Sequence, residues 1–195
     1  MKLEDIINLA NQNNGYLTPE LIKNNEIYTS YIHRLVIAEE LYKVERGIYI
    51  TKQGIEDEYY INNLKYTNIV YSGDTAIFLN GLSNKQSPEK EVSIAYGMNI
   101  SKLEGYTIKQ SRKDTFYLGI TMIETPFGNK VRCYDKERCI CDLFIRPDNY
   151  DYEDRVYAIN AYKNEYLNLD KLYEYAKKLG VLDKVKSVFE VIAWN

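Results

Sequence analysis

The chain of 195 residues has the size of one ordinary domain or two small ones, and its 45% hydrophobic and 27% charged residues are typical of a folded globular protein. Its net charge of −3 excludes a nucleic-acid coat held by bulk positive charge, but it allows a small DNA-reading module with a local basic face. The first residues are acidic, so no signal peptide is predicted. The sequence has no run of about 18 apolar residues, so no membrane span is predicted. We therefore expect a cytoplasmic protein without a membrane partner.

Residues 1–52 are expected to form a winged helix-turn-helix. An apolar stripe over Leu3–Ala10 predicts a first helix, and the Thr-Pro pair that follows predicts the start of a second. A third helix is expected over Tyr28–Glu39, and residues 41–44 and 48–50 predict two strands joined by a glycine-bearing turn. Three helices followed by a hairpin is the element order of a winged helix.

The polar face of the third helix is the candidate DNA-reading surface. Its hydroxyl, imidazole and guanidinium groups are suited to base edges and phosphates in a major groove, and two cations on the hairpin are suited to the adjacent backbone. The alternative is an ordinary solvated helix face, because residues 1–52 carry six basic and seven acidic side chains. The candidate DNA-binding residues are Thr29, Ser30, His33, Arg34, Lys43 and Arg46.

The rest of the chain predicts a helical linker over 53–63 and a mixed α/β domain over 64–195, so that the whole is of the α+β class. Its C-terminal half, from Asp135 onward, is expected to be helical, with Gly180 separating the last two helices. Strands are expected at Ile69–Tyr71, Val92–Tyr96, Tyr106–Lys109, Phe116–Ile123 and Lys130–Cys133.

Two motifs in this part have residue types that occur in chemical sites. Cys139 and Cys141 are separated by a single residue, and with Cys133 they have no evident fourth ligand, which favours buried reduced thiols over a zinc site. Residues 72–75 (SGDT) are similar to the start of a nucleotidyltransferase site, but no Asp-x-Asp follows nearby, and a helix N-cap accounts for them. We expect no catalytic residue, no metal and no cofactor.

Two further segments carry a resemblance to a known family. Tyr71–Ser83 (YSGDTAIFLNGLS) and Val131–Leu143 (VRCYDKERCICDL), together with the winged-helix order, resemble the AbiEi-type abortive-infection antitoxins over essentially the whole chain. The resemblance implies an antitoxin of a bacterial type IV toxin–antitoxin system. It implies a winged helix that represses its own operon at promoter inverted repeats, and a C-terminal domain that neutralises a nucleotidyltransferase-like toxin without a stable complex.

The resemblance also places DNA recognition on the third helix and on the hairpin around Gly47. Members of the family often have more basic residues at the positions of Thr29, Ile37 and Ala38. We therefore expect modest affinity per monomer and pairing of copies on the inverted repeats, and the sequence allows a monomer in solution without fixing the oligomeric state.

Cations in the strand-rich half could serve the antitoxin role. If the strands pack as neighbours, these cations would form a basic face for a nucleic acid or for an acidic surface of the toxin, and the alternative is scattered solvated charge. Arg138 and Asp142, four residues apart, predict a surface ion pair. The candidate basic face consists of Lys102, Lys109, Arg112, Lys113, Lys130 and Arg132.

Two other functions remain open from the residues themselves. A nucleotide-processing enzyme would place several acidic groups around one metal-sized pocket in residues 64–195. A regulator that senses a small molecule would instead have a closed apolar pocket there.

Overall fold

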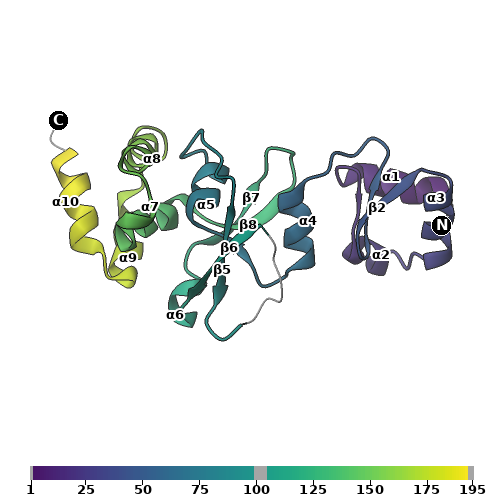
Figure 1. Ribbon diagram of the computed structural model, residues 1–195, viewed down its shortest axis with the longest axis horizontal. Coiled ribbons are helices and arrows are strands. Elements are labelled where there is room, and N and C mark those ends of the chain that lie inside the picture. Colours follow the sequence, from purple (N-terminus) through teal and green to yellow (C-terminus); the bar gives the residue numbers. More distant parts are fainter. Residues whose placement is uncertain (1, 99–104, 193–195) are drawn as a thin grey trace. The chain divides into compact units, whose positions relative to one another are not determined.

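The computed structural model describes residues 2–98 and 105–192 and divides the chain into two compact units. Unit 1 comprises Met1–Thr67 and Glu124–Lys130, and unit 2 comprises Asn68–Ile123 and Val131–Asn195. Both helices and two separate sheets are present, so the architecture is mixed α+β (Figure 1). None of the helices in the described part of the chain combines the length and the apolar character that crossing a bilayer requires.

Unit 1 contains the expected three helices followed by a hairpin. A short strand, β1, was not predicted from the sequence, because its two residues are defined only by their pairing with β3, where Tyr16 lies opposite Ile50. The strands form an antiparallel sheet in the order β1-β3-β2. The elements are α1 (Leu3–Gln12), β1 (Tyr16–Leu17), α2 (Pro19–Asn24), α3 (Thr29–Ile37), β2 (Leu41–Glu45), β3 (Ile48–Thr51) and α4 (Glu58–Lys65).

Local signals in the sequence explain where these helices begin and what they bury. The Thr18 hydroxyl accepts a hydrogen bond from the Leu21 backbone N–H, and Pro19 occupies the first helical position of α2, as the Thr-Pro pair predicts. The apolar faces of α1 and α3 meet in one buried cluster that includes Ile6 and Ile32. Burial of these apolar side chains is the main force that stabilises so small a unit.

Residues 53–63, expected to be a linker, lie in unit 1, and the helix here is α4. Its apolar residues Tyr60, Ile61 and Leu64 pack against a second buried cluster, which includes Tyr16 of β1. Asp57 caps the helix by accepting a hydrogen bond from the Tyr60 backbone N–H. A helix with so much packed apolar surface is part of a core, although its many polar residues resemble those of a solvated linker.

Asp57 also holds a segment that is distant in the sequence. Its carboxylate is fully buried and accepts hydrogen bonds from the Thr125 hydroxyl at 2.6 Å and from the Asn129 side-chain amide at 2.9 Å. The Asn14 side chain adds a bond to the Gly128 carbonyl at 2.9 Å. These contacts explain why residues 124–130, which connect two strands of the larger sheet, belong to unit 1.

Unit 2 is built around a five-stranded mixed sheet in the order β6-β5-β4-β8-β7. β4 runs antiparallel to β5 and parallel to β8, and β5 runs parallel to β6. Its strands and first helices are β4 (Val70–Tyr71), α5 (Gly73–Leu79), β5 (Lys90–Ala95), β6 (Tyr106–Ser111), α6 (Lys113–Phe116), β7 (Ile120–Glu124) and β8 (Lys130–Tyr134).

The strand predicted over Phe116–Ile123 is wrong in its first half, where the chain forms the end of α6 and a turn before β7 begins at Ile120. Gly119 lies in this turn with a φ of +82°, a left-handed conformation that favours glycine. A Cβ added at Gly119 would lie 2.8 Å from Cβ of Arg138, so no larger residue fits there.

The C-terminal half is helical, as predicted. Gly180 adopts the left-handed conformation at the end of α9 and separates it from α10. Cys133, Cys139 and Cys141 are buried free thiols, also as predicted. The remaining elements are α7 (Lys136–Ile145), a 3₁₀ turn η1 (Pro147–Asn149), α8 (Tyr152–Glu165), α9 (Leu169–Leu179) and α10 (Leu182–Ile192).

Candidate functional site

The α3 helix of unit 1 presents a polar face to solvent. Ile32 and Leu35 anchor its opposite face in the core, with exposed fractions of 4% and 3%. Tyr28, the N-cap residue, is 69% exposed, and its ring packs edge-to-face with the ring of Tyr31. The exposed residues on the polar face are Thr29, Ser30, His33, Arg34 and Ile37.

The β2–β3 hairpin presents two cations. Lys43 and Arg46 are both exposed, and Gly47 occupies the turn with a φ of +76°. Glu45, the acidic residue between them, accepts a hydrogen bond from the Arg46 backbone N–H and forms an ion pair with Lys65 of α4. The negative charge of Glu45 is therefore compensated within unit 1, which leaves the positive charge of the hairpin available to an anionic partner.

The structure separates the residues of the candidate basic face. Lys109 lies in β6, Arg112 directly follows this strand, and Lys113 begins α6, whereas Lys130 and Arg132 lie on β8. Two other strands lie between β6 and β8, which corresponds to a separation of about 14 Å at the usual strand spacing. Lys102 lies outside the described residues.

The two segments that carry the family resemblance pack against each other within unit 2. Tyr71 of β4 is the parallel partner of Cys133 in β8. The side-chain amide of Asn80, at the end of α5, donates to the Tyr134 carbonyl at 2.8 Å and also contacts the sulfur of Cys139 at 3.7 Å. These segments therefore build one shared core, which explains residues such as Asn80 without a catalytic role.

The start of α7 is held by partly buried ion pairs within unit 2. Asp135 caps the helix at the Arg138 backbone N–H, and Lys171 of α9 lies 3.1 Å from Asp135 and 2.8 Å from Glu137. The expected Arg138–Asp142 ion pair is present at 2.9 Å. It is not a surface pair, because the Arg138 side chain is only 5% exposed and also donates to the Thr115 and Leu118 carbonyls.

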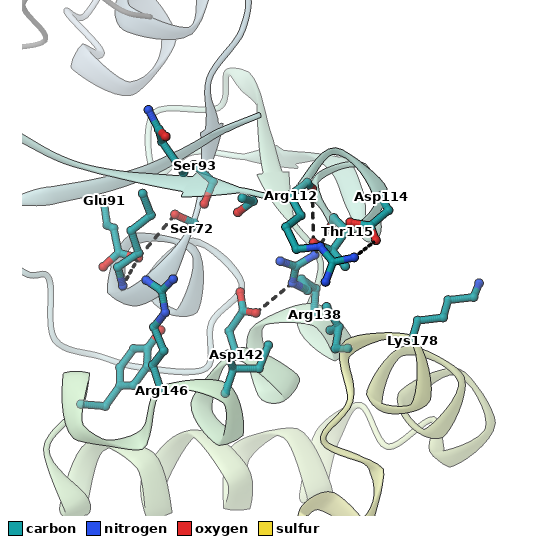
Figure 2. A pocket seen from close by; sticks show the side chains of 16 residues that line it. Ser72, Glu91, Ser93, Arg112, Asp114, Thr115, Arg138, Asp142, Arg146 and Lys178 are labelled. Carbon is teal, nitrogen blue, oxygen red and sulfur yellow. Dashed lines mark hydrogen bonds and ion pairs between the residues drawn. The ribbon is translucent and has the colours of Figure 1, made fainter. Parts of the chain in front are cut away.

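This buried arginine forms part of the wall of a polar cavity of about 310 Å³ in unit 2 (Figure 2). The cavity lies at the ends of β4, β5 and β6, and helices α6, α7 and α9 complete its wall. Three acidic and five basic side chains line it. The acidic residues are Glu91, Asp114 and Asp142, and the basic residues are Lys109, Arg112, Arg138, Arg146 and Lys178.

The SGDT segment forms one side of this cavity. Ser72 precedes α5 as the motif predicts, but its hydroxyl makes no capping bond and lies 3.4 Å from the Glu91 carboxylate. A Cβ at Gly73 would collide with that carboxylate, so the glycine leaves the space that Glu91 occupies. Lys109, the neighbour of Ser93 in the parallel β5–β6 ladder, forms an ion pair with Glu91 at 2.7 Å. The lack of a side chain at Gly73 therefore gives Glu91 the room to pair with Lys109.

One acid of the cavity, Asp142, lies in a poorly solvated environment. Burial raises the pKa of Asp142 above its usual value, and the Arg138 guanidinium opposes the rise. Burial also raises the pKa of nearby Asp74, and the negative charge of Glu91 adds to the effect. Among the described residues, no three His, Cys, Asp or Glu side chains are grouped closely enough to hold a metal ion.

Comparisons with known proteins support the fold alone. No family model matches the chain, and no curated protein matches it. The chain is similar to the crystal structure of the Rv2827c protein from Mycobacterium tuberculosis, with a TM-score of 0.56 and 12% sequence identity. The match covers 92% of this chain and 75% of that protein's chain.

Sequence reasoning did not identify most of the residues that line the cavity. Glu91 and Lys109 are far apart in the sequence, and only the parallel pairing of β5 with β6 brings them together. Arg146 follows the last turn of α7 and belongs to no motif. The SGDT segment marks the end of β4, where the cavity begins, whereas Lys109, Arg112, Arg138 and Asp142 were singled out for other roles and not as parts of one site.

Proposed function

We propose that this chain is the cytoplasmic antitoxin and autorepressor of a type IV toxin–antitoxin system, and that unit 1 is a winged helix-turn-helix that binds promoter DNA. The observation that carries the DNA-binding proposal is the topology of unit 1. Its helix α3 directly precedes a β2–β3 hairpin in a sheet of order β1-β3-β2, and both α3 and the hairpin expose polar or cationic side chains. A winged helix uses these two elements to read a major groove and to contact the adjacent backbone.

The chemistry of the exposed side chains is consistent with this role. Arg34 is suited to the acceptor atoms of guanine, and the short hydroxyl side chains of α3 are suited to bases or phosphates. Lys43 and Arg46 would supply phosphate contacts from the hairpin. Because residues 1–52 carry almost balanced charge, few phosphates would be neutralised per copy, and two copies on an inverted repeat would bind more tightly than one.

A gel-shift titration of the full chain with DNA from upstream of its own gene tests the assignment. We expect the Arg34→Ala/Arg46→Ala double variant to bind about 10- to 100-fold more weakly, because it loses the base contact of Arg34 and the phosphate contact of Arg46. The salt dependence of its affinity should also be smaller, because binding without the Arg46 contact releases fewer counterions. Lys177→Ala/Lys184→Ala, which removes two exposed cations of unit 2, is the matched control and should bind as the natural protein does. Unchanged affinity of the Arg34/Arg46 double variant would contradict the assignment.

The proposed antitoxin activity resides in unit 2. Its support is the packing of the two resemblance segments into one compact unit that contains none of the candidate DNA-binding residues. Neutralisation of the nucleotidyltransferase-like toxin, without a stable complex, should therefore be separable from DNA binding.

Co-expression of the full chain with the toxin encoded beside it tests this separation. The Arg34→Ala/Arg46→Ala variant should restore growth as well as the natural protein does. Arg112→Glu/Lys113→Glu reverses two exposed charges of the candidate basic face and should reduce rescue if that part of the face acts on the toxin or on a nucleic acid. Loss of rescue in the Arg34/Arg46 variant at normal protein levels would contradict the division of roles.

A further inference from the structure

The polar cavity of unit 2 is lined by one exposed cation, Arg146, that has no partner among the residues that the structure describes. The acidic residues in its wall are each paired with a cation: Glu91 with Lys109 at 2.7 Å, Asp142 with Arg138 at 2.9 Å, and Asp114 with Arg112 at 2.6 Å. Of the two remaining cations, Lys178 forms an ion pair with Glu174 on its own helix.

Arg146 is the remaining cation. Its guanidinium makes no hydrogen bond and no ion pair with any residue in the described ranges 2–98 and 105–192. Figure 2 shows this side chain extending from the end of α7 into the cavity, on the side of Ser72 and Glu91. A planar guanidinium with five N–H donors is well suited to bind two oxygens of a phosphate group at once.

The rest of the wall indicates what the phosphate should be attached to. Hydroxyl groups of Ser72, Ser93, Ser111 and Thr115 line the cavity, and the paired carboxylates of Glu91 and Asp142 retain oxygen atoms that can accept hydrogen bonds. A second anionic group would be repelled beside these carboxylates, whereas sugar hydroxyls or amino groups could donate to them. The side chain of Tyr150 adds an aromatic surface to the same wall.

The size of the cavity sets a further limit. A volume of about 310 Å³ lies at the lower end of the range of small-molecule sites, about 300–1,000 Å³. This space suits a single phosphorylated sugar or a nucleoside monophosphate and is too small for a nucleic-acid duplex.

We propose that this cavity binds a small ligand with one phosphate group on a hydroxylated scaffold, and that Arg146 engages the phosphate. The site lies wholly within unit 2, so the proposal does not depend on DNA binding by unit 1. Two classes of ligand carry one phosphate on a hydroxylated scaffold, sugar phosphates and nucleoside monophosphates, and the test distinguishes them.

Calorimetric titration of the full chain with four probes tests the proposal: adenosine 5′-monophosphate, ribose 5-phosphate, adenosine and inorganic phosphate. We expect at least one of the first two to bind more tightly than adenosine and inorganic phosphate. If both bind equally, the sugar phosphate is the recognised part, and if only the monophosphate binds, the base is recognised as well. Equal binding of adenosine would overturn the phosphate assignment, and equal binding of inorganic phosphate would overturn the scaffold assignment.

Variants of Arg146 test its role. Arg146→Ala should weaken binding of the phosphorylated probe by about 10- to 100-fold, because hydrogen bonds to charged groups are stronger than those between neutral groups. Arg146→Lys should recover only part of the affinity, because an ammonium group cannot donate two parallel hydrogen bonds to a phosphate as a planar guanidinium can. Arg34→Ala/Arg46→Ala is the matched control and should bind the probe normally, while Arg146→Ala should still shift promoter DNA. No binding of any phosphorylated probe, or unchanged binding by a folded Arg146→Ala variant, would refute the proposal.

Discussion

The buried carboxylate of Asp57 holds residues 124–130 on unit 1, and its removal should release this segment. In the Asp57→Ala variant, the Thr125 hydroxyl and the Asn129 amide both lose an acceptor. These two residues are only 4% and 5% exposed, so water cannot replace the lost acceptor without local opening of the structure. The variant also removes the N-cap of α4.

The expected cost follows from these three losses. A buried polar group left without a partner costs about 1–3 kcal/mol, and loss of a helix N-cap costs about 1 kcal/mol. Together they predict that Asp57→Ala lowers the free energy of unfolding of unit 1 by about 3–7 kcal/mol, which is a large part of a typical domain stability of about 5–15 kcal/mol. Asp57→Asn retains a capping oxygen and should cost less, about 1–3 kcal/mol, because one of its two oxygens becomes an amide donor.

Native-state hydrogen exchange measures this cost at single amides. The backbone N–H of Thr125, bonded to the Asn129 carbonyl, and that of Tyr60, bonded to Asp57, should exchange more than 100-fold faster in Asp57→Ala, while amides of unit 2 helices are unchanged. Asn168→Ala removes an exposed N-cap of α9 and is the control, expected to cost only about 1 kcal/mol within unit 2. A loss below about 1 kcal/mol in Asp57→Ala would show that the buried network does not hold the segment.

Three further predictions concern other buried groups. Burial raises the pKa of Tyr16 from 10.0 to about 12, so the folded state keeps a proton that the unfolded chain loses. The stability of unit 1 should therefore fall as the pH rises from 10 toward 12, and in Tyr16→Phe this part of the pH dependence should be absent from urea titrations. Gly73→Ala should displace the Glu91 carboxylate from Lys109 and lower the melting temperature of unit 2. Gly97→Ala should cost less, because Gly97 also has a positive φ but a Cβ added there would meet no atom within 4 Å. Burial raises the pKa of all three cysteine thiols, so a maleimide should label none of them in the folded protein at pH 7 and all of them in urea.

The sequence by itself determined the elements that depend on nearby residues. The spacing of apolar residues, the Thr18-Pro19 start of α2 and the left-handed Gly180 each act within a few residues. The first three helices of unit 1 and the break between α9 and α10 were therefore predicted correctly. The burial of the three cysteines also followed from their type and spacing. The prediction over Phe116–Ile123 failed because the glycine at 119 interrupts a stretch whose side chains otherwise favour a strand.

Only the tertiary structure decided which distant residues became neighbours. The pairing of β5 with β6 brings Lys109 to Glu91, and the packing of α7 buries Arg138 in the wall of a cavity. Charges that were expected on the surface therefore form ion pairs inside unit 2. The buried carboxylate of Asp57 likewise brings residues 124–130 into unit 1. Strand order and helix packing are set by the collective burial of apolar surface across the whole chain, and this long-range balance leaves no local pattern around Arg146 or Asp57.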